Sequence, residues 1–217
     1  MKKQDIEFVR EKLLSWGRVH YCRYPWRDIR DPWLALLAEL LLQRTNAKHV
    51  ARYFQEISSS FPHPRSVLEA SDASLAIFEG KFGLDRRLQS ILAAAAYLDS
   101  KDIYPTDYEA LISVYGIGHY TASAYLSLHM NVRAVLIDSN VSRWLARFSG
   151  NEKPHDVRHC PWLWKFADEL TPARDFKEYN YAVLDFTMNV CKPGKPKCEV
   201  CPLAAKCHFW VCGAIAQ

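Results

Sequence analysis

Hydrophobic residues recur every three to four positions along most of this 217-residue chain, a spacing that places them on one face of an α-helix. Glycine and proline interrupt the pattern repeatedly, so the sequence predicts about ten short helices separated by turns. Only residues 133–137, Arg-Ala-Val-Leu-Ile, resemble a strand, and one isolated strand cannot build a sheet. The pattern therefore predicts an all-α fold.

The length of the chain allows one large domain or two small lobes, because single cores rarely grow beyond about 250 to 300 residues. Without a low-complexity linker, we expect a compact boundary that the chain crosses near residues 21–25 and again near residues 131–138. The longest apolar run, residues 33–42, contains Glu39 and is too short to span a membrane. The N-terminus lacks the apolar stretch of a secretory signal, so we expect a cytoplasmic protein.

The composition is that of an ordinary globular protein. It combines 49% hydrophobic residues with 28 Lys and Arg against 24 Asp and Glu, a formal net charge of +4. This balance gives no support to a disordered, collagen-like or low-complexity chain.

The seven cysteines are the first sign of a specific chemistry. An odd number in a chain without an export signal argues against a disulfide framework. Four of them have the spacing Cys-x6-Cys-x2-Cys-x5-Cys, namely Cys191, Cys198, Cys201 and Cys207. This irregular spacing favours an iron–sulfur cluster, with a zinc site and four unrelated buried thiols as weaker alternatives. The other three have no spacing partner and are interpreted as structural: Cys22, Cys160 and Cys212.

A pair of glycines stands between two helical patterns in residues 111–122. Gly116 and Gly118 are expected to let the backbone turn through positive φ, and they keep side chains away from an approaching backbone. The second glycine is expected to open a helix, whose exposed amides favour a phosphate group. A Gly-x-Gly pair alone is equally typical of a plain helix–helix turn, so its context has to decide between the two.

Two carboxylates occupy unusual positions. Glu39 interrupts a helix that is apolar on nearly every face, so an unpaired carboxyl there would have a raised pKa and could act as a general acid. A Glu39 at the solvent edge, or paired with an arginine, is the competing interpretation. Asp138 begins a helical pattern as its N-cap, where a carboxylate stays ionised and can stabilise a cationic intermediate. Such a pair of carboxyl groups is used in glycosidic bond cleavage.

The hairpin, the Asp that follows Gly118 by twenty residues and the cysteine spacing together resemble the helix-hairpin-helix DNA glycosylases of the endonuclease III and MutY type. The resemblance implies a two-lobed fold, with a six-helix barrel at residues 22–133 that carries the hairpin. An iron–sulfur domain would be built from residues 1–21 and 134–217. It also implies that the four spaced cysteines bind a [4Fe-4S] cluster.

Position 120 separates two branches of this family. A lysine there makes a glycosylase that is also a lyase, because an amine can attack the sugar C1′. Tyr120 cannot do so and implies a monofunctional glycosylase. Residues 42–50 resemble the thymine-DNA mismatch branch more than the adenine branch, and residues 82–87 lack the Gly-Tyr-Tyr of adenine glycosylases. The chain also ends ten residues after Cys207, where we expect an adenine glycosylase to continue into a further domain.

The resemblance implies roles for individual residues. Glu39 would donate a proton or hydrogen bond to the leaving base, Asp138 would stabilise the cationic sugar, and Tyr120 would pack near that sugar. The residues expected to contact DNA are Gln43, Arg44, Leu84, Gly116, Gly118, His119 and Asn140. Tyr115 and His119 replace the proline and the cation that are usual in the hairpin, which predicts a weaker or pH-dependent phosphate contact.

The expected function is removal of thymine or uracil mispaired with guanine from double-stranded DNA. We expect a monomer associated with the nucleoid and not with membranes. One alternative is an adenine DNA glycosylase acting on adenine opposite guanine or oxidised guanine. Another is a DNA-binding module with a structural cluster and no chemistry, although the Glu39 and Asp138 pair favours an enzyme.

Overall fold

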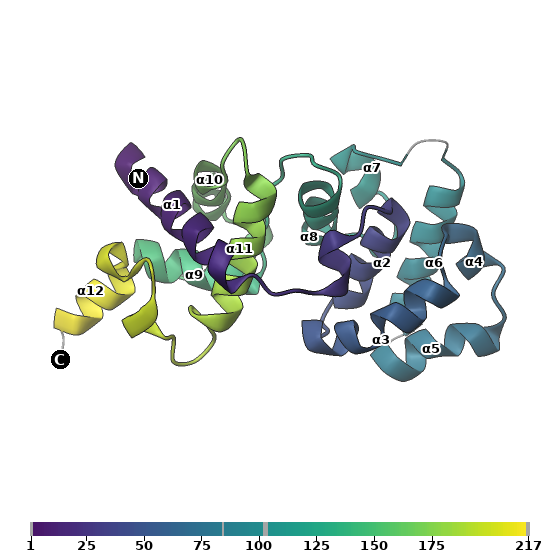
Figure 1. Ribbon diagram of the computed structural model, residues 1–217. Helices are drawn as coiled ribbons and strands as arrows, with labels where there is room; N and C mark the ends of the chain where they lie inside the picture. Colours follow the sequence, from purple (N-terminus) through teal and green to yellow (C-terminus); the bar gives the residue numbers. More distant parts are fainter. Residues whose placement is uncertain (1, 84, 102–103, 216–217) are drawn as a thin grey trace. The chain divides into compact units, whose positions relative to one another are not determined.

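The computed structural model describes residues 2–83, 85–101 and 104–215, which are built from helices and loops (Figure 1). No β-strand occurs among these residues, and residues 133–137 form a loop between helices. The prediction of an all-α fold is therefore confirmed. None of the helices in the described ranges is both long and apolar enough to cross a membrane.

The chain divides into two units, of which the first is the continuous segment Arg23–Val132. Its helices are η1 (Pro25–Asp28), α2 (Pro32–Leu42), α3 (Ala47–Ser60), α4 (Pro64–Leu68), α5 (Asp72–Phe82), α6 (Asp85–Asp99), α7 (Tyr108–Ile112), α8 (His119–Ala124) and the π-helical turn η2 (Tyr125–His129). Helix α2 packs against α3, α6, α8 and η2. Eight of its 11 residues are buried, so α2 is the core helix of this unit.

The second unit combines Met1–Cys22 with Arg133–Gln217, so both ends of the chain contribute to it. Its helices are α1 (Lys3–His20), α9 (Ser139–Ser149), η3 (Val157–His159), α10 (Pro161–Leu170), α11 (Phe176–Asn189), η4 (Cys198–Val200), η5 (Ala204–Lys206) and α12 (His208–Ile215). Figure 1 shows α1, in purple, beside α11, in green, and these two helices form an extensive contact. A core around Leu13, Trp144 and Phe186 lies among them.

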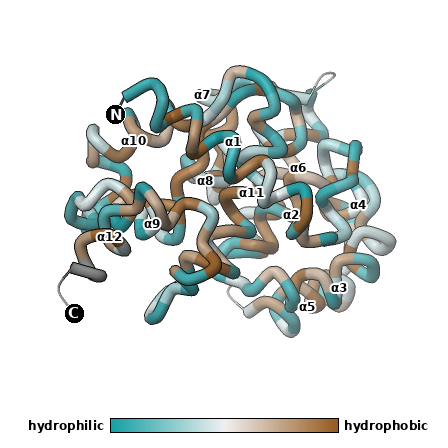
Figure 2. The backbone as a smooth tube through the Cα atoms, turned by 60° about the vertical axis from the view of Figure 1, so that its left-hand side comes forward, coloured by the Kyte–Doolittle hydropathy of each residue, from teal (hydrophilic) through white to brown (hydrophobic). Residues whose placement is uncertain are grey.

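Local sequence signals account for where many of these helices begin. Asp31 caps α2 by accepting a hydrogen bond from the amide of Leu34, and Pro32 follows it in the first helical position. Asn46 caps α3 in the same manner. Hydrophilic and hydrophobic residues alternate as teal and brown bands along many of the helices (Figure 2), which is the amphipathic pattern that lets such a helix bury one face.

Candidate active site and cysteine cavity

The glycine pair lies in the turn between α7 and α8 (residues 113–118). Gly116 has a φ of +83°, and an added Cβ would lie 2.0 Å from Ser90 Oγ, so no other residue fits there without rearrangement. Gly118 opens α8 as expected, but its φ is −90° and its position is open. The prediction of positive φ is thus confirmed at Gly116 and wrong at Gly118, because an N-cap residue takes an extended backbone.

The Gln43 side chain fastens this hairpin to the end of α2. Its Nε2 donates to the carbonyl oxygen of Gly116 at 2.9 Å and lies 3.1 Å from Thr121 Oγ1. The amide is therefore engaged within the unit, and it fixes the register between the hairpin and α2.

The adjacent Arg44 is exposed and has a φ of +55°, a left-handed conformation that is costly for a residue with a side chain. The buried guanidinium of Arg87 supports this loop by donating to the carbonyl oxygen of Gln43 and to Thr45 Oγ1. Burial lowers the pKa of Arg87. The loop therefore holds Arg44 in a strained conformation at the surface. Leu84 lies outside the described residues.

Two of the predicted site residues occupy the first turn of α8. Tyr120 is half-buried, whereas His119 is exposed, with its Nδ1 2.5 Å from the hydroxyl oxygen of Tyr108 on α7. Burial raises the pKa of Tyr108. Tyr115 is 59% exposed at the tip of the hairpin. His119 is thus held by a tyrosine of the preceding helix.

Glu39 is buried in α2, with 4% of its surface exposed, as one of the two sequence interpretations expected. The carboxyl is nevertheless paired, and its partner is neither solvent nor an arginine. Its Oε1 lies 3.1 Å from Nε2 of His129, whose side chain is 2% exposed. The sequence pattern gave no indication of this histidine, because it is separated from Glu39 by 90 residues.

Asp138 belongs to the second unit and is the N-cap of α9, as predicted. Its Oδ1 accepts hydrogen bonds from the amides of Asn140 (2.9 Å) and Val141 (2.8 Å), and its Oδ2 accepts one from Asn140 Nδ2 at 2.8 Å. These three bonds fix the orientation of the carboxylate at the start of α9. Asn140 is in turn held by Arg143, which donates to its Oδ1 at 2.9 Å.

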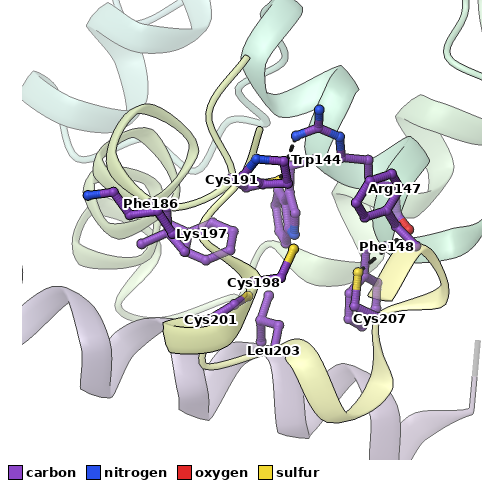
Figure 3. Close-up of a pocket in the computed structure, with 13 residues that line it drawn as sticks. Trp144, Arg147, Phe148, Phe186, Cys191, Lys197, Cys198, Cys201, Leu203 and Cys207 are labelled. Atoms are coloured by element: carbon purple, nitrogen blue, oxygen red, sulfur yellow. Dashed lines mark hydrogen bonds between the residues drawn. The ribbon is translucent and has the colours of Figure 1, made fainter. Parts of the chain in front are cut away.

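The four spaced cysteines line a single cavity in the second unit, together with Trp144, Phe148, Phe186 and Leu203 (Figure 3). The space between atoms in and around this cavity, including open solvent at its mouth, is about 320 Å³. Burial raises the pKa of the Cys201 thiol to about 12 and also raises the pKa of Cys191. Within the described residues, no three His, Cys, Asp or Glu side chains converge closely enough to share one metal ion.

Helix α9 connects this cysteine cavity to Asp138. Arg143, one turn after the cap, donates to the carbonyl oxygen of Cys191 at 3.0 Å. One turn further, Arg147 lies 3.8 Å from Cys191 Sγ and donates to the carbonyl oxygen of Lys192 at 2.9 Å. Neither arginine was predicted from the sequence, although their spacing of four residues places them on one face of the helix.

The predicted residues therefore group by unit. Glu39, Gln43, Arg44 and the hairpin with Tyr120 belong to the unit Arg23–Val132, whereas Asp138, Asn140 and the cysteines belong to the other. Within the first unit, hydrogen bonds join α2 to the hairpin and to η2. Within the second, the bonds of α9 join the Asp138 cap to the cysteine segment.

Several known proteins of nearly the same length are similar to this chain. A thymine/uracil-DNA glycosylase of Pyrobaculum aerophilum is 34% identical, with 95% of this chain and 93% of that protein aligned. A thymine-DNA glycosylase of Aeropyrum pernix is 30% identical over 97% of both chains. The solved structure of a thermostable thymine-DNA glycosylase superposes with a TM-score of 0.88 at 25% identity, covering 96% of this chain and 97% of that one.

Adenine DNA glycosylases match as well, but over less of their own length. The one from Buchnera aphidicola subsp. Baizongia pistaciae is 29% identical, and the alignment covers 95% of this chain and 60% of that protein. No model of a protein family matches the chain.

The fold, together with the hairpin and the capped aspartate that follows it, is that of a helix-hairpin-helix DNA glycosylase. Within that class, the chain belongs to the family of thymine/uracil-DNA glycosylases and is an enzyme of the DNA N-glycosylase type.

Proposed function

We propose that this protein removes thymine or uracil mispaired with guanine from double-stranded DNA, as a monofunctional glycosylase of base excision repair. The observation that carries the proposal is the Asp138 cap, which presents a hydrogen-bonded carboxylate in a member of this family. A carboxylate held in a fixed orientation by hydrogen bonds is suited to stabilise the cationic sugar that forms when the base leaves. We propose a monomer that acts on DNA at the nucleoid.

The reaction would begin with rotation of the target base out of the duplex, which costs least where the base is mispaired. Arg44, exposed and held in its strained backbone conformation, would fill the emptied position in the stack. Glu39 would then donate a proton or hydrogen bond to the departing base, and Asp138 would stabilise the sugar until water completes the hydrolysis. Gly116, Gly118 and His119 would contact the phosphate backbone, and such contacts position the DNA without reading its sequence.

The cysteine cavity supports the proposal of a [4Fe-4S] cluster, for which Cys191, Cys198, Cys201 and Cys207 would be the ligands. A single zinc ion needs four sulfur atoms about 2.3 Å from one point. The thiols surround a cavity and do not converge in this way. A cluster of four irons gives each thiolate its own metal, so thiols distributed around a cavity suit it better. The cluster would be structural or would help to position DNA, because four thiolates leave no ligand position open.

The function is tested with four duplex oligonucleotides that differ at one pair. They carry G·T, G·U, A·G or adenine opposite oxidised guanine, and alkali reveals the abasic sites. We expect cleavage of the G·T and G·U duplexes at rates at least about tenfold above those of the adenine-containing ones. Faster cleavage of the adenine duplexes would assign the chain to the adenine branch. Binding without abasic sites in any duplex would indicate a module without chemistry.

Tyr120 provides a separate test of the monofunctional assignment. We expect Tyr120→Lys to place an amine beside the sugar and to form a Schiff base that borohydride traps as a covalent protein–DNA adduct. The wild type and Tyr120→Phe, which keeps the ring and adds no amine, are the matched controls and should give no adduct. If Tyr120→Lys cleaves the G·T duplex and still gives no adduct, position 120 does not face the sugar.

A further inference from the structure

Glu39 and Gln43 lie one turn apart and therefore on the same face of α2. Each bonds to the segment formed by α8 and η2: Gln43 to Thr121 at the start, and Glu39 to His129 at the end. Two polar contacts thus fix the register of α2 against the segment that carries Tyr120. The contact at Glu39 is the buried one, since its carboxyl and the imidazole are 4% and 2% exposed.

We infer that His129 is a positioning residue for Glu39, and that it directs the proton of the Glu39 carboxyl to the oxygen that faces the leaving base. This inference rests on the proposed function, because it assumes that Glu39 donates to the departing base. His129 would act entirely through Glu39 and would not touch the DNA.

The tautomer of His129 follows from its surroundings. Its Nδ1 is buried without a hydrogen-bond partner among the described residues. A proton on that nitrogen would bury an N–H group without an acceptor, which is costly. The neutral tautomer with its proton on Nε2 leaves only a lone pair unsatisfied. This tautomer donates to Oε1 of Glu39 over the observed 3.1 Å.

The position of the carboxyl proton follows from this tautomer. An oxygen that accepts a hydrogen bond from Nε2–H does not also carry a proton directed at that donor, so the proton of a neutral Glu39 resides on Oε2. The bond from His129 is made to Oε1 and not to Oε2. That oxygen is therefore available to the base, while Oε1 is held by His129. The bond also fixes the plane of the carboxyl, as a catalytic proton donor requires.

The fold around His129 fits a functional constraint. Helix α8 passes into the π-helical turn η2, in which the amide of Met130 donates to the carbonyl oxygen of Tyr125, five residues earlier, at 3.1 Å. Single π-turns of this kind are rare and frequently occur at functional sites. His129 is the last residue of this turn, so the turn helps to place its ring beside α2.

The test compares two variants that carry the same amide group one methylene apart. The amide of His129→Gln reaches the position of Nε2 and can still donate to Glu39, whereas the amide of His129→Asn stops near the position of Nδ1. In single-turnover reactions on the G·T duplex, we expect His129→Asn to be slower than wild type by about tenfold or more, and His129→Gln to recover most of the rate. The affinity for an uncleavable duplex should stay within about twofold for both.

Combination with Glu39→Gln distinguishes positioning from a general structural role. If His129 acts through Glu39, His129→Asn should slow Glu39→Gln no further, because both changes remove the same interaction. The inference is overturned if the Asn and Gln variants cleave at equal rates, or if His129→Asn slows Glu39→Gln as much as it slows wild type. If the wild-type protein fails to cleave both the G·T and the G·U duplex, the proposed function itself is contradicted. That outcome is distinct from the two that overturn the role of His129.

Discussion

Asp138→Asn is expected to lower the single-turnover rate of base removal by about 10³-fold or more while leaving DNA binding intact. The substitution removes the negative charge that is proposed to stabilise the cationic sugar, and it changes the shape of the side chain very little. Asparagine is as good an N-cap as aspartate, so its Oδ1 can still accept from the amides of Asn140 and Val141. Abasic sites revealed by alkali measure the rate, and an uncleavable G·T duplex measures the affinity.

Asp31→Asn is the matched control, because Asp31 caps α2 through the amide of Leu34 in the same geometry, at 2.8 Å. It makes the same chemical change at a helix cap without a proposed role in the reaction, and we expect unchanged rates. Both variants should keep their melting temperatures within a few degrees of wild type. An Asp138→Asn protein that cleaves at the wild-type rate would refute the role of this carboxylate.

Local chemistry explains why parts of the candidate site could be predicted from sequence. Asp138 follows an apolar run and precedes a helical pattern, and a capping side chain acts on amides only two and three residues away. Gly116 was predictable for the same reason, since a tight turn between helices demands positive φ. In both cases the residues that determine the conformation are neighbours in the sequence.

The partners of these residues could not be predicted in this way. His129 meets Glu39 across 90 positions, and Arg87 reaches the carbonyl oxygen of Gln43 across 44. Both are polar groups whose burial depends on tertiary packing, so helical periodicity carries no information about them. The partner of Glu39 was not predicted for this reason. The sequence indicated a buried carboxyl, but the interpretations considered were an unpaired group, a group at the solvent edge or a pair with an arginine, and not a pair with a histidine.

The cysteine pattern shows the same division between local and distant information. The spacing identified four residues that the fold brings around one cavity. The arginines that bond to the same segment come from α9, more than 40 residues earlier, and no spacing rule connects them with the cysteines. Because Arg143 bonds to Asn140 as well as to Cys191, the cap at Asp138 and the cysteine cavity share a support. Loss of the cavity's structure should therefore also disturb the candidate catalytic carboxylate.

The last prediction follows from this shared support. Cys198→Ser is expected to abolish retention of the proposed iron–sulfur cluster, since a serine hydroxyl is a poor replacement for a thiolate ligand. Iron and sulfide analysis of the purified protein measures the loss directly. Because binding of the proposed cluster would contribute to folding, we also expect a clear drop in melting temperature and a loss of glycosylase activity.

Cys22→Ser is the matched control, since Cys22 is also partly buried in the second unit but does not line the cavity. It should keep wild-type iron content and activity. Retention of four irons by Cys198→Ser would contradict the ligand assignment, and a purified wild type that contains zinc and no sulfide would overturn the cluster itself. Iron loss with full activity would contradict the proposed coupling between the cysteine cavity and the Asp138 cap through Arg143.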